Sequence, residues 1–395
     1  MRVLFHVQHL LGIGHLQRAL AITQALAGRG ADVTLVSGGS PIPALAAAPA
    51  HLVQLPPIRA RDESFALVDA GGRDVDDALR AARRDLVLSA FAEARPDAVI
   101  VEGYPFARRA FRFELDPLVG AARAARPRLP LLCSIRDILV ARDDPARDRA
   151  IVARIREDFD AVLVHADRAF VPLEASFPRA AEIADRLVYT GYVTMAAPGD
   201  GEAPERDGQG EVLVSAGGGA VGYRLLTAAL AARRSGLLAD RPWRLITGMN
   251  LGEAEFGTLA QTAPTGVLIE RHRADFRRLL RRCAVSVSQA GYNTVLDVLA
   301  ARVPAVLVPF ATARETEQSL RAERLAARGV VEQIPAADLT PTALAAAVSR
   351  VMARPRAPFL FDTNGAARAA EIVLGMVERG SKAIVSQAKP RRIRE

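Results

Sequence analysis

Residues 211–234 read EVLVSAGGGAVGYRLLTAALAARR, and this stretch decides the fold. An apolar run of strand character is followed by a glycine loop and then by apolar residues at helical spacing, the pattern that opens a doubly wound parallel sheet. The start of the chain has the same order, with an apolar run at 3–7, a loop containing Gly12 and Gly14, and a helical pattern over 15–28. We therefore expect two similar α/β halves.

Continuous apolar runs separated by helical patterns indicate parallel sheets that are covered on both faces. Between 195 and 210 the chain is rich in Pro, Gly and charged residues, which is typical of a linker. The predicted organisation is a first Rossmann-like domain at 1–194, a linker at 195–210, and a second Rossmann-like domain at 211–365. A helix at 366–380 is expected to pack back on the first domain, and a basic tail at 381–395 is expected to be disordered.

The composition excludes several classes of protein. With 395 residues, 50% of them hydrophobic and 24% charged, the chain is neither intrinsically disordered nor collagen-like. The net charge is +8, but most arginines alternate with Asp and Glu, which favours solvated helix faces over a nucleic-acid surface. Nucleic-acid binding is therefore the least favoured alternative, because aromatic residues do not interleave with the basic runs.

The cysteines and the apolar runs predict a cytoplasmic protein. Cys133 and Cys283 are far apart in the chain and are expected to be free thiols in a reducing compartment. No apolar run reaches the roughly 18 residues that span a bilayer, and polar residues interrupt the apolar N-terminus too early for a signal peptide. Peripheral contact with the inner face of a membrane stays open, with the basic and apolar stretch 108–113 as the candidate patch.

The stretch 288–297, SQAGYNTVLD, has the pattern of a diphosphate site. Gly291 supplies a turn after a strand, and Asn293 and Thr294 open a helix whose free amides and positive end favour an anion. Asp297 follows about one turn into this helix, where a carboxylate can accept hydrogen bonds from the ribose hydroxyls. Taken alone, the stretch is better explained as an ordinary helix cap followed by an acidic residue in the first turn.

The stretch does not stand alone. Upstream lies GGGAVGYR at 217–224, and downstream lie RVPAVLVPF at 302–310, the pair Glu317-Gln318, and Ala322. This ordered set resembles the nucleotide-sugar-binding C-terminal domain of glycosyltransferase family twenty-eight, whose best-known members make the lipid-linked peptidoglycan precursor. The resemblance implies a GT-B fold, in which two Rossmann-like domains with parallel sheets face each other across a cleft.

The resemblance also implies roles for single residues at the donor site. Arg224 matches an arginine that neutralises the donor phosphate, and Asp297 stands where the family usually has a ribose-binding glutamate. The pair Glu317-Gln318 matches positions that meet the hydroxyls of the donor sugar, where the family often has two glutamines. The stretch 271–273 matches the segment whose backbone reads the base. The candidate donor-binding residues are Gly218, Gly219, Arg224, His272, Gly291, Asn293, Thr294, Asp297, Glu317 and Gln318.

His15 is the first candidate for a catalytic base. It follows a glycine loop at the expected N-terminus of a helix, where the positive helix end favours a neutral imidazole that can take a proton. The same loop, GIGH at 12–15, resembles the N-terminal loop of the family. A histidine that merely caps or packs at a tight turn is the alternative.

The segment after the run 98–101 holds further candidates. Glu102 is the alternative base, Tyr104 is a candidate for stacking on a sugar, and nearby arginines are suited to an anionic acceptor. This segment departs from the peptidoglycan enzymes, which indicates a different acceptor. The candidate acceptor contacts are Gly14, Tyr104, Arg108, Arg109 and Arg136.

The resemblance, taken with these residues, implies two alternative enzymatic functions. The first is a metal-independent, inverting glycosyltransferase of hexosyltransferase type, without a cofactor, which moves a sugar from a UDP-linked donor to a hydroxyl acceptor. The alternative is a UDP-sugar hydrolase with water as the acceptor, because hydrolases of pseudaminic acid synthesis carry a similar glycine–histidine loop. The sequence predicts no metal site and leaves the sugar, the acceptor and the oligomeric state open.

Overall fold

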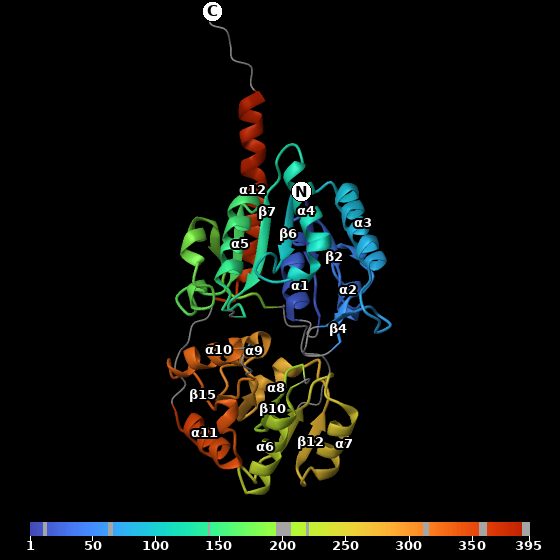
Figure 1. Cartoon of the computed structure of the whole chain (residues 1–395). Helices are drawn as coiled ribbons and strands as arrows, with labels where there is room; N and C mark the ends of the chain where they lie inside the picture. Colours follow the sequence, from blue (N-terminus) through green and yellow to red (C-terminus); the bar gives the residue numbers. More distant parts are fainter. Residues whose placement is uncertain are drawn as a thin grey trace, which may run out of the picture. The chain divides into compact units, whose positions relative to one another are not determined.

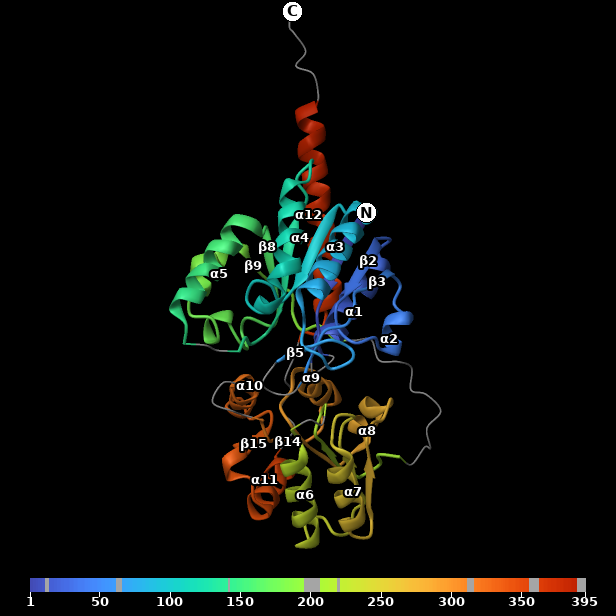
Figure 2. The same ribbon diagram turned by 45° about the vertical axis from the view of Figure 1, so that its right-hand side comes forward.

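The structure is a computed structural model that describes residues 1–10, 14–61, 66–140, 143–194, 207–218, 221–310, 316–354 and 362–388. It divides into two compact units, and each is described by itself. The first comprises Met1–Leu139, Asp143–Met195 and Asp362–Glu395, and the second comprises Val140–Arg142 and Ala196–Phe361. Figures 1 and 2 show both units from two directions.

The first unit is built on a seven-stranded parallel sheet. Its strand order is β3-β2-β1-β6-β7-β8-β9, so the chain changes direction of travel between β1 and β6. The strands are β1 (Arg2–Val7), β2 (Asp32–Ser37), β3 (His51–Gln54), β6 (Ala98–Glu102), β7 (Leu131–Arg136), β8 (Ala161–His165) and β9 (Leu187–Tyr189), and a short antiparallel pair is formed by β4 (Arg59–Ala60) and β5 (Leu67–Val68).

Helices cover both faces of this sheet. Because successive strand residues point to opposite faces, Val3, Phe5 and Val7 share one face, and there they pack against α1 (Gly14–Ala27) and α12 (Gly365–Ala388). The remaining helices of the unit are α2 (Pro43–Ala46), α3 (Asp77–Ala94), α4 (Arg112–Ala124) and α5 (Pro145–Asp158).

The last helix belongs to the core of the first unit. Ala369, Val373 and Val377 on α12 are buried in the same cluster as Leu16 and Leu20 on α1. Figures 1 and 2 show α12 (red) running beside the first sheet and continuing past its edge. The helix extends to Ala388 and so continues into the range expected to be a disordered tail.

The second unit repeats the plan with a six-stranded parallel sheet, in the order β12-β11-β10-β13-β14-β15. Its strands are β10 (Val212–Ser215), β11 (Trp243–Ile246), β12 (Val267–Glu270), β13 (Val285–Ser288), β14 (Ala305–Leu307) and β15 (Glu332–Gln333). Its helices are α6 (Tyr223–Arg234), α7 (Glu253–Thr262), α8 (Phe276–Arg282), α9 (Tyr292–Ala301), α10 (Glu317–Ala326) and α11 (Pro341–Ala353).

The α/β class with a parallel sheet in each of two units is confirmed. In each sheet the chain reverses its direction of travel beside the first strand of the unit, β1 or β10, and ligands of such sheets bind outside the carboxyl ends of the strands at that point. The residues that follow β1, β6, β10 and β13 are therefore the candidates for contact with a ligand.

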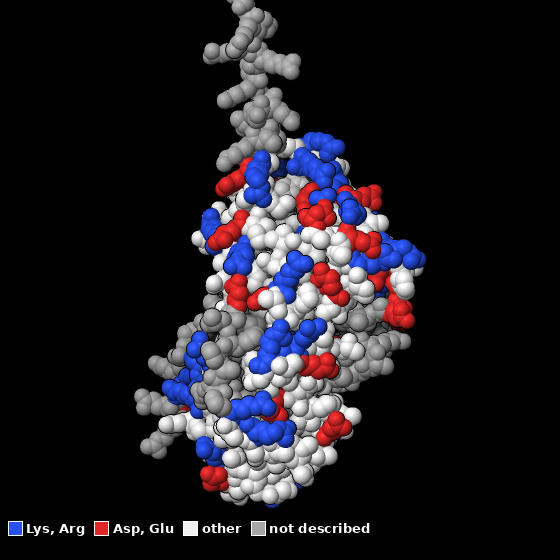
Figure 3. Space-filling model, turned by 90° about the vertical axis from the view of Figure 1, so that its left-hand side faces the viewer, with Lys and Arg blue, Asp and Glu red and all other residues white. Residues whose placement is uncertain are grey.

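Charge on the surface is mixed. Figure 3 shows basic and acidic side chains alternating over the first unit on the face it presents. Many of these residues form ion pairs, such as Arg123 with Asp160 at 2.8 Å and Arg29 with Glu371 at 2.7 Å. Among the described residues, no helix is long and apolar enough to cross a membrane.

Candidate functional site

His15 and Glu102 meet at the carboxyl edge of the first sheet. Glu102 is the last residue of β6, and His15 lies in the first turn of α1, which follows the neighbouring strand β1. The Nδ1 atom of His15 is 2.6 Å from Oε1 of Glu102. The Glu102 side chain is 2% exposed and that of His15 is 26% exposed. The two residues that the sequence offered as alternative bases are thus partners.

The geometry decides the tautomer of His15. An ionised carboxylate only accepts hydrogen bonds, so the proton of the 2.6 Å bond resides on Nδ1, and Nε2 keeps a lone pair. Burial, the largest effect, lowers the pKa of His15 to about 3 despite the attraction of Glu102. Burial alone would raise the pKa of Glu102, but His15, Arg18 and Arg108 hold it well below its usual range. A neutral imidazole beside a carboxylate is able to take a proton at Nε2.

Two guanidinium groups surround this pair. Arg18 on α1 donates through Nη2 to Glu102 Oε1 at 2.7 Å. Nη2 of Arg108 lies 3.9 Å from the other oxygen, Oε2, which has no hydrogen-bond partner among the described residues. Arg108 takes a left-handed backbone conformation, with φ of 61°, in the loop after β6. Burial lowers the pKa of Arg108, and the positive charges of Arg136 and Arg18 act in the same direction.

The other candidate acceptor contacts differ in their surroundings. Gly14 begins α1, Arg136 ends β7, and Arg109 is exposed on a short 3-10 helix. Tyr104, by contrast, is buried and donates its hydroxyl hydrogen bond to Asp116. Burial and this bond raise the pKa of Tyr104 to about 12. The ring and hydroxyl of Tyr104 thus have partners within the first unit, and its contact with a sugar stays a prediction.

The candidate membrane patch at 108–113 is partly buried. Phe111 is buried, and the guanidinium of Arg83 lies 5.5 Å from the centre of its ring. Arg108 points to Glu102 instead of outward. Arg109 and Arg112 in the same stretch are exposed and Phe113 is partly exposed, so membrane contact through this stretch stays a prediction.

Sequence reasoning missed a buried polar network behind this edge. The side chains of Arg83 on α3 and Glu114 on α4 are both 0% exposed and form two hydrogen bonds of 2.7 Å. Arg83 also donates to Gln8 Oε1 at 2.9 Å and to the carbonyls of Gly38 and Pro56 at 2.8 and 2.6 Å. Because Gln8, Gly38 and Pro56 follow β1, β2 and β3, the network ties together three loops at the carboxyl edge. An arginine inside a helical pattern gives no sequence signal of this kind.

In the second unit, three loops converge at the carboxyl edge around the glycines after β10. The backbone amide of Asn250, after β11, donates to the carbonyl of Gly218 at 3.1 Å. A Cβ built on Gly217 would lie 3.7 Å from Oγ1 of Thr294, in the first turn of α9. Gly217 has φ of 61°, a conformation that favours glycine. Gly218 is thus part of this cluster, whereas Gly219 lies outside the described residues.

The N-terminus of α9 has the features of an anion site. Gly291 is its N-cap, no side chain of the described residues caps it, and no described atom beyond its chain neighbours lies within 4 Å of the place where a Cβ of Gly291 would stand. Asn293 and Thr294 lie in the first turn and are partly exposed. Uncapped amides at the positive end of a helix are suited to bind a phosphate.

Asp297 is already held by a cation. Its Oδ1 accepts a hydrogen bond from Nε of Arg277 on α8 at 2.7 Å. Burial raises the pKa of Asp297, while Arg277 opposes this shift. The pairing fixes the orientation of the carboxylate, and sequence reasoning did not foresee it because Arg277 lies on another helix.

The pair Glu317-Gln318 at the start of α10 acts on the backbone around α9. Oε1 of Gln318 accepts hydrogen bonds from the amides of Ala290 and Phe310, each at 3.1 Å. Glu317 pairs with the buried Arg321 at 3.1 Å, and Arg321 also donates to the carbonyl of Ala290 at 2.7 Å. The side-chain oxygen of Gln318 thus holds the turn before Gly291, and the expected contact of Gln318 with sugar hydroxyls stays a prediction.

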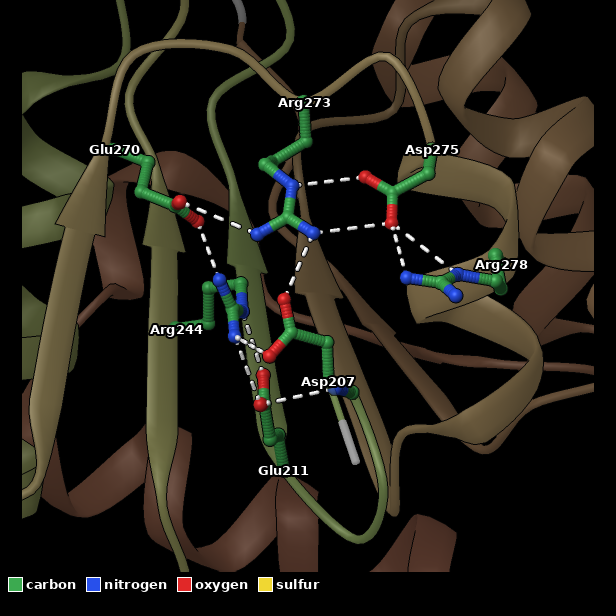
Figure 4. Close-up of polar contacts among 8 residues, drawn as sticks. Asp207, Glu211, Arg244, Glu270, Arg273, Asp275 and Arg278 are labelled. Atoms are coloured by element: carbon green, nitrogen blue, oxygen red, sulfur yellow. Dashed lines mark hydrogen bonds and ion pairs between the residues drawn. The ribbon is translucent and has the colours of Figure 1, made fainter. Parts of the chain in front are cut away.

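The loop between β12 and α8 is pinned by an ionic network (Figure 4). Arg273 contacts Asp275 at 2.8 Å and Asp207 at 2.9 Å, and these hydrogen bonds raise the pKa of Arg273 above its usual range. Arg244 on β11 binds Glu211 and Glu270 at 2.8 and 2.6 Å. His272, in the same loop, is exposed. Residues 207–210, in the range read as a linker, are thus anchored to the second sheet through Asp207.

Arg224 lies in the first turn of α6, the helix that follows the glycines after β10. It is exposed, and its Nη2 donates to the carbonyl of Ala337 at 3.3 Å. No group of three or more His, Cys, Asp or Glu side chains suited to a metal ion occurs in the described ranges.

Comparisons with known proteins agree with this architecture. Residues 269–373 match the family model of the glycosyltransferase family 28 C-terminal domain. Two curated relatives, from Geobacillus kaustophilus and Phenylobacterium zucineum, are both named UDP-N-acetylglucosamine–N-acetylmuramyl-(pentapeptide) pyrophosphoryl-undecaprenol N-acetylglucosamine transferase. The first is 29% identical over 42% of this chain and 48% of its own length, so the match spans about half of that protein. The second is 27% identical over 66% of this chain and 72% of its own length.

Solved structures match nearly the whole chain. The calicheamicin glycosyltransferase CalG4 has a TM-score of 0.59 at 19% identity and covers 98% of this chain and 99% of its own. MurG of Acinetobacter baumannii has a TM-score of 0.59 at 18% identity and covers 96% and 99%. These proteins are GT-B glycosyltransferases, so the GT-B fold and the resemblance to glycosyltransferase family 28 are confirmed.

Proposed function

We propose that this chain is a glycosyltransferase that moves a sugar from a UDP-linked donor to a hydroxyl group of an acceptor. The observation that carries the proposal is the 2.6 Å contact between His15 and Glu102, which leaves Nε2 of His15 as a base. The family match of residues 269–373 and the UDP-sugar in the names of the relatives support the nature of the donor.

His15 is the group that activates the acceptor. Its Nε2 takes the proton of the acceptor hydroxyl while the oxygen attacks the anomeric carbon of the donor sugar. The bond from this carbon to the diphosphate oxygen breaks in the same step, which inverts the configuration and releases UDP. Glu102 keeps the imidazole in the required tautomer and stabilises the imidazolium that forms.

The second unit holds the donor. The amides at the start of α9 and the glycines after β10 bind the diphosphate, and Asp297 accepts hydrogen bonds from the ribose. Gln318 keeps the turn at Ala290 in place, and its amide group contacts the sugar. Arg224 is the cation for the diphosphate, because its exposed 3.3 Å bond to a carbonyl is readily exchanged for a phosphate oxygen.

These groups supply the positive charge that the departing diphosphate needs. Preorganised amides and an arginine stabilise such charge as it develops. The proposal therefore includes metal independence, and the expected result is that a chelator such as EDTA leaves the rate of UDP release unchanged.

An acceptor with an anionic group fits the first unit. Nε of Arg108 is buried and has no hydrogen-bond partner among the described atoms, and the positive charge of Arg136 is felt at Arg108. A carboxylate or phosphate on the acceptor would relieve this concentration of like charge.

The test combines binding with turnover. Binding of UDP, UDP-sugars, dTDP and ADP is measured by thermal shift, because a ligand that binds the folded state raises stability by mass action, by about 2.7 kcal/mol at one hundred times its dissociation constant. UDP release from the best UDP-sugar is then followed with hydroxyl acceptors that do or do not carry a carboxylate or phosphate. We expect stabilisation by UDP-sugars and acceptor-dependent release that is lost in His15→Ala.

Two outcomes would overturn the proposal. Indifference to all nucleotides would remove the donor assignment. Rapid release of free sugar in the absence of any acceptor, unaffected by acceptors, would instead indicate a hydrolase.

A further inference from the structure

The sequence offered no role for Arg18, yet its side chain donates a hydrogen bond to Glu102, the partner of the proposed base. It lies three positions after His15 on α1, so both side chains share one face of the helix. Its side chain is 3% exposed, and its Nη2 is 2.7 Å from Glu102 Oε1. Burying a guanidinium is costly unless it is paired, so this contact is not a chance surface pairing.

One oxygen of Glu102 serves two donors. His15 Nδ1 and Arg18 Nη2 both reach Oε1, and they lie 3.2 Å from each other. Because Nδ1 carries the proton shared with Glu102, it has no lone pair for Arg18, and the 3.2 Å approach is a contact between two donors. Protonation of His15 at Nε2 would therefore place a second cation directly beside the guanidinium.

Without Arg18, the balance at Glu102 would change. The carboxylate would then be a buried anion whose hydrogen-bonding partner is His15, and its Oε2 has no hydrogen bond of its own within the described structure. A buried carboxylate beside a histidine favours the imidazolium. Arg18 supplies the compensating charge, so the histidine does not need to be charged.

Among the other titratable groups around this site, the positive charge of Arg108 also favours a neutral His15, whereas Glu102 opposes it. Arg108, from the loop after β6, lowers the pKa of His15, and Arg136, at the end of β7, lies close enough to Arg108 to lower its pKa. His165 on β8 is buried, hydrogen-bonded to Ser134 at 2.8 Å and uncharged, since burial lowers its pKa to about 3. Glu102 is the carboxylate that favours a charged His15.

We propose that Arg18 is a positioning residue that neutralises Glu102 and thereby keeps His15 an uncharged base with a free Nε2. This inference rests on the proposed function for its catalytic meaning. Its physical content, the protonation state of His15, can be measured without any turnover.

The decisive experiment is an NMR titration of the His15 imidazole in the full chain labelled at histidine nitrogens. The His15 signal is assigned by its absence in His15→Gln. In the wild type we expect the neutral Nδ1–H tautomer throughout the neutral range. In Arg18→Met we expect the protonation constant of His15 to rise at least tenfold, because the carboxylate then has the imidazole as its counter-charge. Arg18→Lys keeps the charge without the fixed geometry, and its value should lie between the two.

A second variant tests the direction in which Glu102 shifts the pKa of His15. Glu102→Gln removes the carboxylate while Arg18 stays, so the pKa of His15 should fall or stay low, opposite to the change in Arg18→Met. Arg84→Met is the matched control, because Arg84 is exposed and pairs with Asp85 on the surface. It should leave the titration unchanged.

Turnover adds an independent reading. If the chain is a transferase, the acid limb of kcat/KM should move to higher pH in Arg18→Met, since a base with a raised pKa is lost earlier as pH falls. Absence of turnover with a raised His15 pKa would refute the proposed function alone. A His15 pKa that is unchanged or lowered in folded Arg18→Met, or in Arg18→Lys where the Met variant fails to fold, would overturn the role of Arg18.

Discussion

Replacing Arg83 with Met tests the network behind the candidate acceptor edge. The substitution keeps a long apolar side chain but removes every donor, so five hydrogen bonds are lost: two to Glu114, one to Gln8 and two to the carbonyls of Gly38 and Pro56. Glu114 remains fully buried without its cation. Breaking a buried ion pair from one side typically costs about 3–5 kcal/mol.

This cost sets the size of the expected change. A unit of this size loses roughly 2–4 °C per kcal/mol, so we expect the melting midpoint of the first unit to fall by about 6–20 °C. Far-ultraviolet circular dichroism reports on both units, whereas the single tryptophan, Trp243, is buried in β11 and reports on the second. The melting transition seen by circular dichroism should move to lower temperature. The transition followed by the fluorescence of Trp243 should not move and serves as the internal reference.

The loss should also depend on pH. Burial alone would raise the pKa of Glu114, but contacts with His6 and Arg83 hold this pKa below its usual range. In the wild type, the ionised Glu114 therefore stabilises the fold at pH values above its unfolded pKa of about 4.3, and this stabilisation is lost as the pH falls through the lower pKa of the folded state. In the variant Glu114 has lost that cation and accepts a proton more readily. The difference between the two proteins should therefore be largest near neutral pH and shrink towards pH 4.

The neighbouring Arg84 provides the control. Arg84→Met removes an exposed contact with Asp85 and should change stability by less than about 0.5 kcal/mol. The reasoning from the buried pair is refuted if Arg83→Met lowers the free energy of unfolding no more than this control does. It is also refuted if the loss of stability is the same at acidic and neutral pH.

The remaining predictions concern the candidate site. His15→Ala should reduce kcat by about 10²–10⁴ and leave UDP affinity unchanged in calorimetry, and equal losses in both would remove its role as a base. Asp297→Ala should weaken UDP binding by about 10- to 100-fold, in line with hydrogen bonds to a charged group, and unchanged affinity for UDP would argue against ribose contact. Gln318→Ala should weaken UDP binding, because two backbone amides lose their acceptor. Gln318→Glu keeps the side-chain oxygen and should bind UDP more tightly than the Ala variant. Equal affinities of the two variants for UDP would exclude a role for that oxygen.

The two-sheet architecture could be predicted because its signal is local. The strand, glycine loop and helix at 211–234 form a continuous stretch, and β10 (Val212–Ser215) and α6 (Tyr223–Arg234) both lie within it. The start of the chain behaved in the same way, with β1 and α1 flanking the glycine loop.

Relations between distant residues could not be predicted in this manner. His15 and Glu102 were both recognised as candidate bases, but 87 positions separate them, and spacing along the chain does not say that two loop residues share a hydrogen bond. Arg277 and Asp297, on different helices, were not connected for the same reason. The hydrogen bond from Tyr104 to Asp116 could not be foreseen either, because an aromatic residue after a strand gives no sign of the partner that its hydroxyl finds.

The position of α12 has a consequence for how the protein is made. The core of the first unit is complete only when Ala369, Val373 and Val377 pack beside α1, and these residues follow the whole second unit in the chain. The second unit, by contrast, is a nearly continuous stretch that is complete before α12 has been translated. We therefore expect the core of the first unit to stay incomplete in the nascent chain until the second unit has been synthesised. A premature stop after residue 361 would leave the second unit whole and would remove α12 from the core of the first unit.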